Sequence, residues 1–206
     1  MPTFAEICAY LDTLFPPSLA EPWDRDGPAV DPCPAREVTA AVVALDVTSP
    51  AIEYAAAIGA QCIVTHHPLL FELPDALRAD ESVGGRVLAL ARAGIAAVSC
   101  HTRLDSASGG VNDCLARVLG LERVQVLAPA GTDRDGRPYG LGRVGEVPQT
   151  DLRTFAAQVK TALGCGGVRM ADAGRPVRRV AVGGGACGDF IPQVLAAGCD
   201  TFVTSD

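Results

Sequence analysis

The chain has 206 residues, of which 49% are apolar and 20% charged, a composition typical of a folded globular protein and not of a disordered one. Its formal charge is −7 and lysines and arginines form no run, so we expect no nucleic-acid partner. The N-terminus has no basic segment before an apolar run, and no apolar stretch reaches about 18 residues, so we expect neither a secretory signal nor a membrane span.

The first half of the chain alternates strand and helix patterns. Apolar strands are expected at residues 41–46, 62–65 and 95–99, and helices at residues 49–58, 82–93 and 111–119. Ser49 is expected to cap the first of these helices, with Pro50 in its first turn and Gly59 at its end. Strands that alternate with helices predict βαβ units and a largely parallel sheet.

A turn-rich segment at residues 129–138 is the expected boundary between two domains, residues 1–128 and residues 129–206. An amphipathic helix is expected from Asp151 to Leu163. A glycine-rich turn at residues 183–188 matches no nucleotide-binding motif, so we interpret it as a tight connection into a helix. Further strands are expected at residues 141–147, 168–171, 179–182 and 201–204.

The expected fold class is therefore α/β, with two α/β domains and a largely parallel sheet in the first. Because a final buried strand is normally followed by a helix that covers the sheet, we interpret the end of the chain at Asp206 as a C-terminal truncation.

All three histidines of the chain follow predicted strands. His66 and His67 come where the second strand ends, His101 comes where the third ends, and Asp105 follows four residues later. The carboxyl ends of parallel strands share one edge of a sheet, so these side chains are expected to converge there. Imidazole and carboxylate groups are ligands of zinc, iron and manganese. The pattern predicts a metal site at this edge of the sheet, with the metal ligands at strand C-termini.

Adjacent residues in a regular strand point to opposite faces, so His66 and His67 can share a site only if the strand has ended or if each binds a different metal. Pro68 ends the strand ladder, which favours the first case, and a two-metal site would use both rings. A single histidine at a strand end is more often a hydrogen-bonded residue than a ligand, but three of three are harder to explain in that way.

The other acidic residues give weaker signals. Asp46 ends a strand and is explained equally well by the edge of the site or by the start of a helix. Asp24 and Asp26 lie in a turn-rich segment, where hydrogen bonds within the turn are the preferred explanation. The eight cysteines form no Cys-x-x-Cys pair, which favours free thiols in a reducing cytoplasm, although their even number permits disulfides.

With these motifs the chain resembles the Nif-three-like family of dinuclear-metal-centre hexameric proteins, whose members are often described as GTP cyclohydrolase I type 2 homologues. The paired histidines of Thr65-His66-His67-Pro68 and the His101-Thr-Arg-Leu-Asp105 motif are specific in combination. The resemblance runs through Trp23-Asp24 and residues 41–46, 63–71, 99–105, 109–115, 142–145, 180–185 and 200–204.

The resemblance implies that His66, His67 and Asp105 bind two divalent metal ions (zinc, iron or manganese) and that His101 lies beside the site. If the protein is a hydrolase, His101 is the expected catalytic acid or base, because a histidine ring titrates close to neutral pH. The resemblance also implies a ring-shaped homohexamer. In that family a histidine and a glutamate from a C-terminal helix complete the two-metal site, and the present sequence has no fourth histidine to replace that one.

The function expected from the sequence is that of a cytoplasmic, metal-dependent hydrolase, similar to GTP cyclohydrolase by resemblance, that acts on an unidentified small molecule. Two alternatives stay open: a non-enzymatic protein that delivers or stores divalent metal, and a hexameric scaffold that binds partner proteins.

Overall fold

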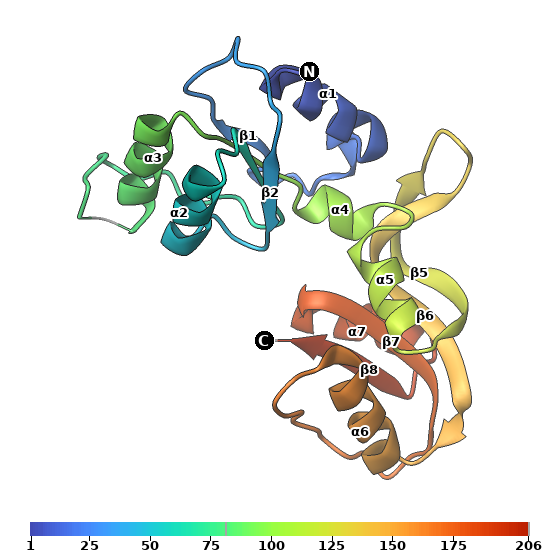
Figure 1. Ribbon diagram of the computed structural model, residues 1–206. Coiled ribbons are helices and arrows are strands. Elements are labelled where there is room, and N and C mark those ends of the chain that lie inside the picture. Colours follow the sequence, from blue (N-terminus) through green and yellow to red (C-terminus); the bar gives the residue numbers. More distant parts are fainter. Residues whose placement is uncertain (81, 206) are drawn as a thin grey trace. The chain divides into compact units, whose positions relative to one another are not determined.

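The computed structural model describes residues 1–80 and 82–205, so Asp206 lies outside it. The chain divides into two compact units, Met1–Leu104 and Asp105–Asp206. The boundary expected after residue 128 instead falls inside a long strand, β5 (Glu122–Thr132). The turn-rich residues 129–138 cover the end of that strand and its turn into the next one, so their prolines and glycines mark a hairpin and not a linker (Figure 1).

The first unit contains a sheet with the strand order β1-β4-β3-β2. Strands β2, β3 and β4 are parallel and paired residue for residue, as the alternation of strands and helices predicts. Strand β1 adds an antiparallel edge that the sequence pattern did not reveal. The bounds of the strands are Gly27–Val30 for β1, Ala41–Ala44 for β2, Cys62–Thr65 for β3 and Ala96–Ser99 for β4.

Helices cover both faces of this sheet, which explains why β3 and β4 are buried along almost their whole length. Phe4 of α1 (Phe4–Leu14) packs on one face with Cys62 and Val98. On the other face, α2 (Ser49–Ala57) and α3 (Ser82–Ala93) pack against Ile63 and Ala97 (Figure 1). A short 3-10 helix, η1 (Pro17–Leu19), follows α1.

Helix α2 begins almost where its sequence predicts. Thr48, and not Ser49, caps it, because the Thr48 side chain accepts a hydrogen bond from the backbone N–H of Ala51. Pro50 lies in the first turn as expected, and the left-handed Gly59 follows the end of the helix.

The second unit has a sheet with the strand order β5-β6-β7-β8, in which β5, β6 and β7 are antiparallel and β8 is parallel to β7. Helices α5 and α6 pack on one face through Ala116 and Phe155, and α7 packs on the other face through Val194. Helix α4 (Thr102–Ser106) joins the two units. The remaining bounds are Val111–Val118 for α5, Pro138–Thr150 for β6, Leu152–Leu163 for α6, Val177–Ala186 for β7, Gly188–Phe190 for the 3-10 helix η2, Ile191–Ala196 for α7 and Thr201–Ser205 for β8.

Two expectations for the second unit were wrong. Residues 168–171 form no strand and lie in the irregular segment between α6 and β7, although their apolar residues alternate. The glycine-rich segment does not turn at residue 183, because β7 continues through Gly183–Gly185 to Ala186. An added Cβ at Gly183 would collide with the Cys187 side chain, so the strand needs a glycine there for close packing.

Within residues 1–80 and 82–205, none of the helices is both long enough and apolar enough to cross a membrane.

Candidate metal centre

Two neighbouring parallel strands bring the histidines to one edge of the first sheet. Thr65, the last residue of β3, pairs with Ser99, the last residue of β4, so the two strands end level with each other. The Cys100 backbone N–H then donates to the Thr65 carbonyl and continues the ladder by one residue. His66 and His101 follow directly, and the sequence-based expectation that they converge is confirmed by the structure.

The chain leaves the strand at His67, which explains how two adjacent histidines reach one place. The His67 backbone N–H donates to the carbonyl of Leu45, and the Thr65 hydroxyl donates to the His67 carbonyl at 2.9 Å. These bonds close a bend that Pro68 follows, so the side chains of His66 and His67 are not held on opposite faces as in a regular strand.

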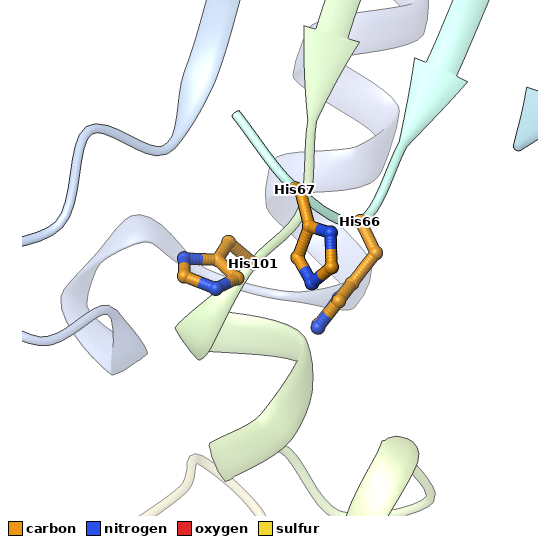
Figure 2. A group of neighbouring side chains, drawn as sticks. All are labelled: His66, His67 and His101. Carbon is orange, nitrogen blue, oxygen red and sulfur yellow. The ribbon is translucent and has the colours of Figure 1, made fainter. Parts of the chain in front are cut away.

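The three rings form one group, which we call the imidazole cluster (His66, His67 and His101). Ring centroids are 5.0 Å apart for His66 and His67, 5.1 Å for His66 and His101, and 5.7 Å for His67 and His101. Figure 2 shows the three rings gathered where the ribbon of each strand runs out. One ring nitrogen from each residue lies within 4.8 Å of the others, so the cluster can hold a metal ion.

A hydrogen bond at Nδ1 fixes the proton position in each ring. Nδ1 of His66 lies 3.0 Å from the Cys100 carbonyl oxygen, which only accepts hydrogen bonds. Nδ1 of His67 lies 2.9 Å from Oδ1 of Asp46, and Nδ1 of His101 lies 2.9 Å from Oδ1 of Asp24. Each neutral ring therefore protonates Nδ1 and carries its lone pair on Nε2, the arrangement that metal-binding histidines adopt.

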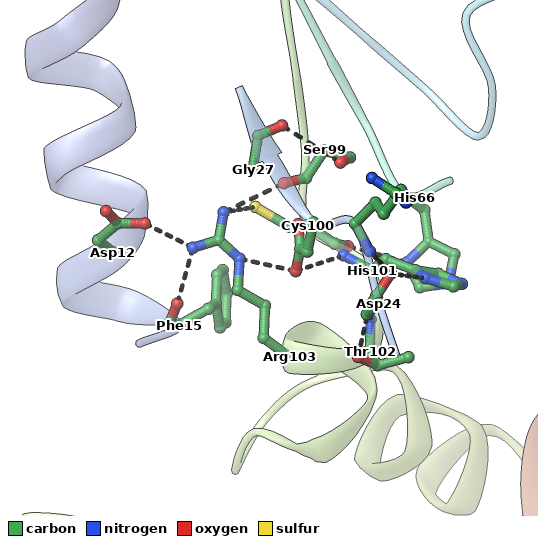
Figure 3. Close-up of polar contacts among 12 residues, drawn as sticks. Asp12, Phe15, Asp24, Gly27, His66, Ser99, Cys100, His101, Thr102 and Arg103 are labelled. Carbon is green, nitrogen blue, oxygen red and sulfur yellow. Dashed lines mark hydrogen bonds and ion pairs between the residues drawn. The ribbon is translucent and has the colours of Figure 1, made fainter. Parts of the chain in front are cut away.

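Asp24 binds the His101 segment at three points. Its carboxylate accepts from the His101 ring, from the Thr102 backbone N–H at 3.0 Å and from the Thr102 hydroxyl at 2.5 Å (Figure 3). Burial by itself would raise the pKa of Asp24, but the hydrogen bonds from Thr102 and His101 outweigh it and hold that pKa below its ordinary value. The carboxylate is thus ionised. The sequence suggested hydrogen bonds within its own turn, but the structure also places it against the candidate site.

A buried arginine supports the same segment from behind. The Arg103 side chain is 2% exposed, and its Nε lies 3.0 Å from Oδ2 of Asp26, while Nη1 donates to Asp12. Asp26 Oδ2 also accepts from the His101 backbone N–H at 3.1 Å. Burial raises the pKa of Asp26, and the nearby Arg103 charge offsets only part of that effect. Figure 3 shows Arg103 between α1 and the His101 segment.

The hydrogen-bond partners of the histidines come mostly from segments that no sequence pattern connects with them. Asp24 and Asp26 precede His101 by about 75 residues and lie before β1, which was not recognised as a strand. For Asp46 the sequence left two explanations open, the edge of the site and the start of a helix, and the structure places its carboxylate against His67. The one signal available was chemical, because three partly buried imidazoles require hydrogen-bond acceptors.

Asp105, the fourth residue expected at the site, belongs to the second unit and is buried there in α4. Its backbone carbonyl accepts from Nδ2 of Asn112 at 3.0 Å, and Oδ1 of Asn112 accepts from the Gly184 backbone N–H at 2.8 Å. An added Cβ at Gly184 would lie 3.9 Å from Oδ1 of Asp105. The glycine-rich end of β7 therefore packs closely beside this carboxylate.

The donor set of the imidazole cluster fits a divalent transition metal. Two nitrogen ligands of one zinc ion, each at about 2.1 Å, lie at most about 4.2 Å apart. Candidate donor atoms within 4.8 Å of one another suit one ion after small side-chain shifts, or two ions about 3.5–4 Å apart that divide the donors between them. The Nδ1 partners supply the outer hydrogen bonds that orient such ligands.

Fold and site together define a two-unit α/β protein with a histidine cluster, able to hold metal, at the carboxyl ends of parallel strands. The chain belongs to the Duf34/NIF3 (NGG1p interacting factor 3) family, whose model it matches over residues 2–206.

Relatives and solved structures agree with this assignment. A Streptomyces coelicolor protein named GTP cyclohydrolase 1 type 2 homolog is 38% identical over all of this chain and 73% of its own length. A Clostridium perfringens protein of the same name is 30% identical over 98% of this chain and 76% of its own length. The crystal structure of a Bacillus cereus protein related to NIF3 matches with a TM-score of 0.92 and 25% identity, covering this whole chain and 82% of that one.

Proposed function

We propose that this protein is a metal-dependent hydrolase in which His66, His67 and Asp105 bind two divalent metal ions and His101 moves a proton. The observation that carries the proposal is the convergence of the three rings, whose ligand atoms lie within 4.8 Å of one another and each of which directs Nδ1 to an acceptor. Because imidazole suits zinc and iron better than manganese, zinc and iron are the preferred ions.

The chain's own residues supply the proton chemistry. Divalent ions bound here would lower the pKa of a bound water and polarise the bond under attack. The lone pair on Nε2 of His101 can accept a proton, and Asp24 at Nδ1 then stabilises the resulting imidazolium. Asp26 holds the backbone of the same residue, so the ring keeps its position during the transfer.

The relatives' shared name, GTP cyclohydrolase 1 type 2 homolog, supports GTP as the first substrate to test. Elemental analysis of the purified chain comes first, beside the double variant His66→Ala, His67→Ala. About two metal ions per chain, lost in the variant, support the proposed centre. Metal-free protein in both samples after incubation with zinc or iron overturns it.

Turnover separates the hydrolase from a metal carrier. We expect the metal-loaded chain to hydrolyse GTP or a related nucleotide, and the variant His101→Gln to lose at least about 100-fold in kcat. Loaded protein that turns over no nucleotide, phosphoester or amide, but transfers its metal to an acceptor protein, supports the delivery function instead. His67 is 45% exposed, so metal held there is open to exchange.

We also propose a cytoplasmic homohexamer, which the family resemblance supports. All eight cysteines are free thiols in the part of the chain that the structure describes, in keeping with a reducing compartment. Light scattering tests the assembly, and the expected mass is about six times the 21.2 kDa of one chain. A monomer at micromolar concentration contradicts it.

A further inference from the structure

Two large aromatic side chains lie beside the imidazole cluster. The Trp23 and Phe71 rings are 6.1 Å apart between centroids, and each is also near His101, at 6.3 Å and 6.2 Å respectively. All three contacts are edge-to-face, with interplanar angles of 75° to 89°. An edge-to-face pair covers one face of only one of its two rings, so these three contacts leave other ring faces uncovered.

Both side chains are exposed in spite of their size. Trp23 is 59% exposed and Phe71 is 46% exposed, and Trp23 is the only tryptophan of the chain. A single exposed apolar residue is ordinary, but two aromatic rings in contact with each other and with a candidate catalytic ring form a continuous surface. Pockets for small molecules combine such surfaces with a few polar groups that fix orientation.

The turn that carries Trp23 is fixed to the site on both sides of this residue. The Glu21 backbone N–H donates to the Thr102 hydroxyl at 2.9 Å, and the Asp24 backbone N–H donates to the Glu21 carbonyl at 3.0 Å. Asp24 in turn binds His101 and Thr102 through its carboxylate. Trp23 is therefore held beside His101 by the same bonds that orient the His101 ring, and exposure of its indole does not result from a loose loop.

Phe71 is anchored in a similar way by its neighbours. Leu69 is buried in the core between the sheet and α2, and Leu70 packs against the same core. The segment from His67 to Phe71 thus leaves the strand, buries Leu69, partly buries Leu70 and then presents an aromatic ring to the surface. Since Trp23 and Phe71 come from different segments, their contact brings two separately fixed rings to one place.

We propose that Trp23 and Phe71 form an aromatic subsite that binds a planar heteroaromatic ring of the substrate beside the imidazole cluster. The rings offer π faces, which favour a flat heterocycle over an aliphatic or sugar group. The bond to be hydrolysed then lies next to His101, which both aromatic rings contact. The inference rests on the proposed hydrolase function for its substrate, but the subsite itself is tested without metal or turnover.

The single tryptophan reports directly on this subsite. The whole 206-residue chain, freed of metal with a chelator, is titrated with guanosine while Trp23 fluorescence is excited at a wavelength that tyrosine does not absorb. Guanosine has no phosphate, so any binding comes from the ring and the sugar, and ribose 5-phosphate is the matched control for the sugar. The variant Phe71→Leu tests the second ring. Tyr54→Leu, at an α2 residue that is also 59% exposed, controls for loss of an exposed aromatic side chain.

We expect saturable quenching by guanosine, none by ribose 5-phosphate, binding about tenfold weaker in Phe71→Leu and unchanged binding in Tyr54→Leu. Two results overturn the subsite: guanosine that fails to quench, or quenching that Phe71→Leu does not weaken. The subsite is also contradicted if acrylamide fails to quench Trp23 fluorescence in the free protein, because another surface then covers the indole ring. If guanosine quenches Trp23 but the protein hydrolyses nothing, the aromatic subsite is supported and the hydrolase function is contradicted. If the protein hydrolyses nucleotides but guanosine does not quench Trp23, the hydrolase function is supported and the subsite is contradicted.

Discussion

The proton on the His101 ring is placed by one carboxylate. Asp24 accepts from Nδ1 of His101, and both the backbone N–H and the hydroxyl of Thr102 donate to the other carboxylate oxygen. In Asp24→Asn the amide oxygen must stay with Thr102, because those two groups can only donate in this arrangement. The amide NH₂ then faces Nδ1, which has to become the acceptor. We expect His101 to change from the Nδ1–H tautomer to the Nε2–H tautomer.

Nitrogen-15 NMR of the metal-free chain measures this change. The His101 signals should exchange their protonated and unprotonated shifts in Asp24→Asn, while those of His66 and His67 stay in place. Asp46→Asn is the matched control, since it removes the same charge from the partner of His67 and leaves His101 untouched. A His101 ring that keeps its Nδ1 proton in Asp24→Asn contradicts the positioning role. Metal affinity should fall about 10- to 100-fold in Asp46→Asn, whose partner His67 is a proposed metal ligand.

At this scale the sequence predicted that the three histidines come together and missed most of the groups that orient them. His66, His67 and His101 were identified because strand ends are visible in the apolar pattern and all three histidines of the chain follow such ends. Asp24 was assigned to a local turn because its hydrogen-bond partners lie about 75 residues away, and no periodicity records a long-range side-chain contact. The backbone N–H of Arg25 does donate to Asp24, so the local interpretation describes one of its bonds.

The long hairpin of the second unit depends on a glycine that no other residue can replace. Gly140 in β6 has a φ of +147°, and an added Cβ would overlap the carbonyl oxygen of Ala128 on β5. Its own carbonyl accepts from Arg143. Gly140→Ala combines backbone strain with a collision against backbone, so we expect a loss of about 3 kcal/mol in the free energy of unfolding.

Gly136, in the turn of the same hairpin, is the matched control. Its φ is +76° and an added Cβ would meet nothing within 4 Å, so Gly136→Ala carries only the cost of a left-handed backbone, about 1 kcal/mol. Urea denaturation of both variants measures the difference. Equal losses would show that the close contact with Ala128 is relieved by a shift of the strand.

A buried ion pair ties α5 to this hairpin and makes the second unit sensitive to acid. Arg143 is 2% exposed, and its Nε lies 2.5 Å from Oδ1 of Asp113. Burial acts to raise the pKa of Asp113, but the hydrogen bond from Arg143 prevails and holds that pKa below its ordinary value. A carboxyl with a lowered folded-state pKa stabilises the fold above its unfolded pKa, near 4, and loses this contribution as the pH falls through the folded pKa.

Asp113→Asn should therefore lower the free energy of unfolding by about 2 kcal/mol at pH 7. Below pH 4 the difference in this free energy between the variant and the wild type should shrink with each step in pH. Denaturant titrations from pH 7 to pH 3 measure the trend. The exposed Asp189 on η2 provides the control, since Asp189→Asn should change stability by less than about 0.5 kcal/mol at every pH. A cost that stays constant with pH would assign the effect to packing and not to the charge.

Among the elements, the strands and helices of the first unit were predictable because its parallel strands are buried on both faces. Helix α3 has the bounds its sequence predicts, Ser82–Ala93, and β3 begins and ends as expected. Strand β1 was missed because Pro28 and the exposed residues of an edge strand leave no alternation to read. The same cause hid β5, whose first four residues are all exposed.

The division of the whole chain was harder to predict than its elements. The turn of the β5–β6 hairpin contains more turn-forming residues than the real boundary at residues 104 and 105, which lies inside a helix, α4. Composition marks bends in the backbone, whereas a boundary between compact units depends on which residues pack together. Helix α5 shows this, because Ala116 packs with Phe155 and Val180 in the core of the second unit.

Metal binding should appear as stability of the folded chain. A ligand that binds only the folded state at a concentration about 100 times its Kd adds about 2.7 kcal/mol. For a chain of this size that corresponds to a rise in Tm of about 5 to 10 °C. We expect zinc to produce this rise in the wild-type chain, and a chelator to reverse it. Differential scanning calorimetry measures both.

The double variant His66→Ala, His67→Ala separates the cluster from other zinc sites. Two of the three imidazoles are then absent, so its Tm should not respond to zinc. The histidines all lie in Met1–Leu104, and apart from them only the thiols and carboxylates of the two units are left to offer a metal. If the variant is stabilised as much as the wild type, zinc binds through those thiols and acids, and the imidazole cluster is not the metal site of this protein.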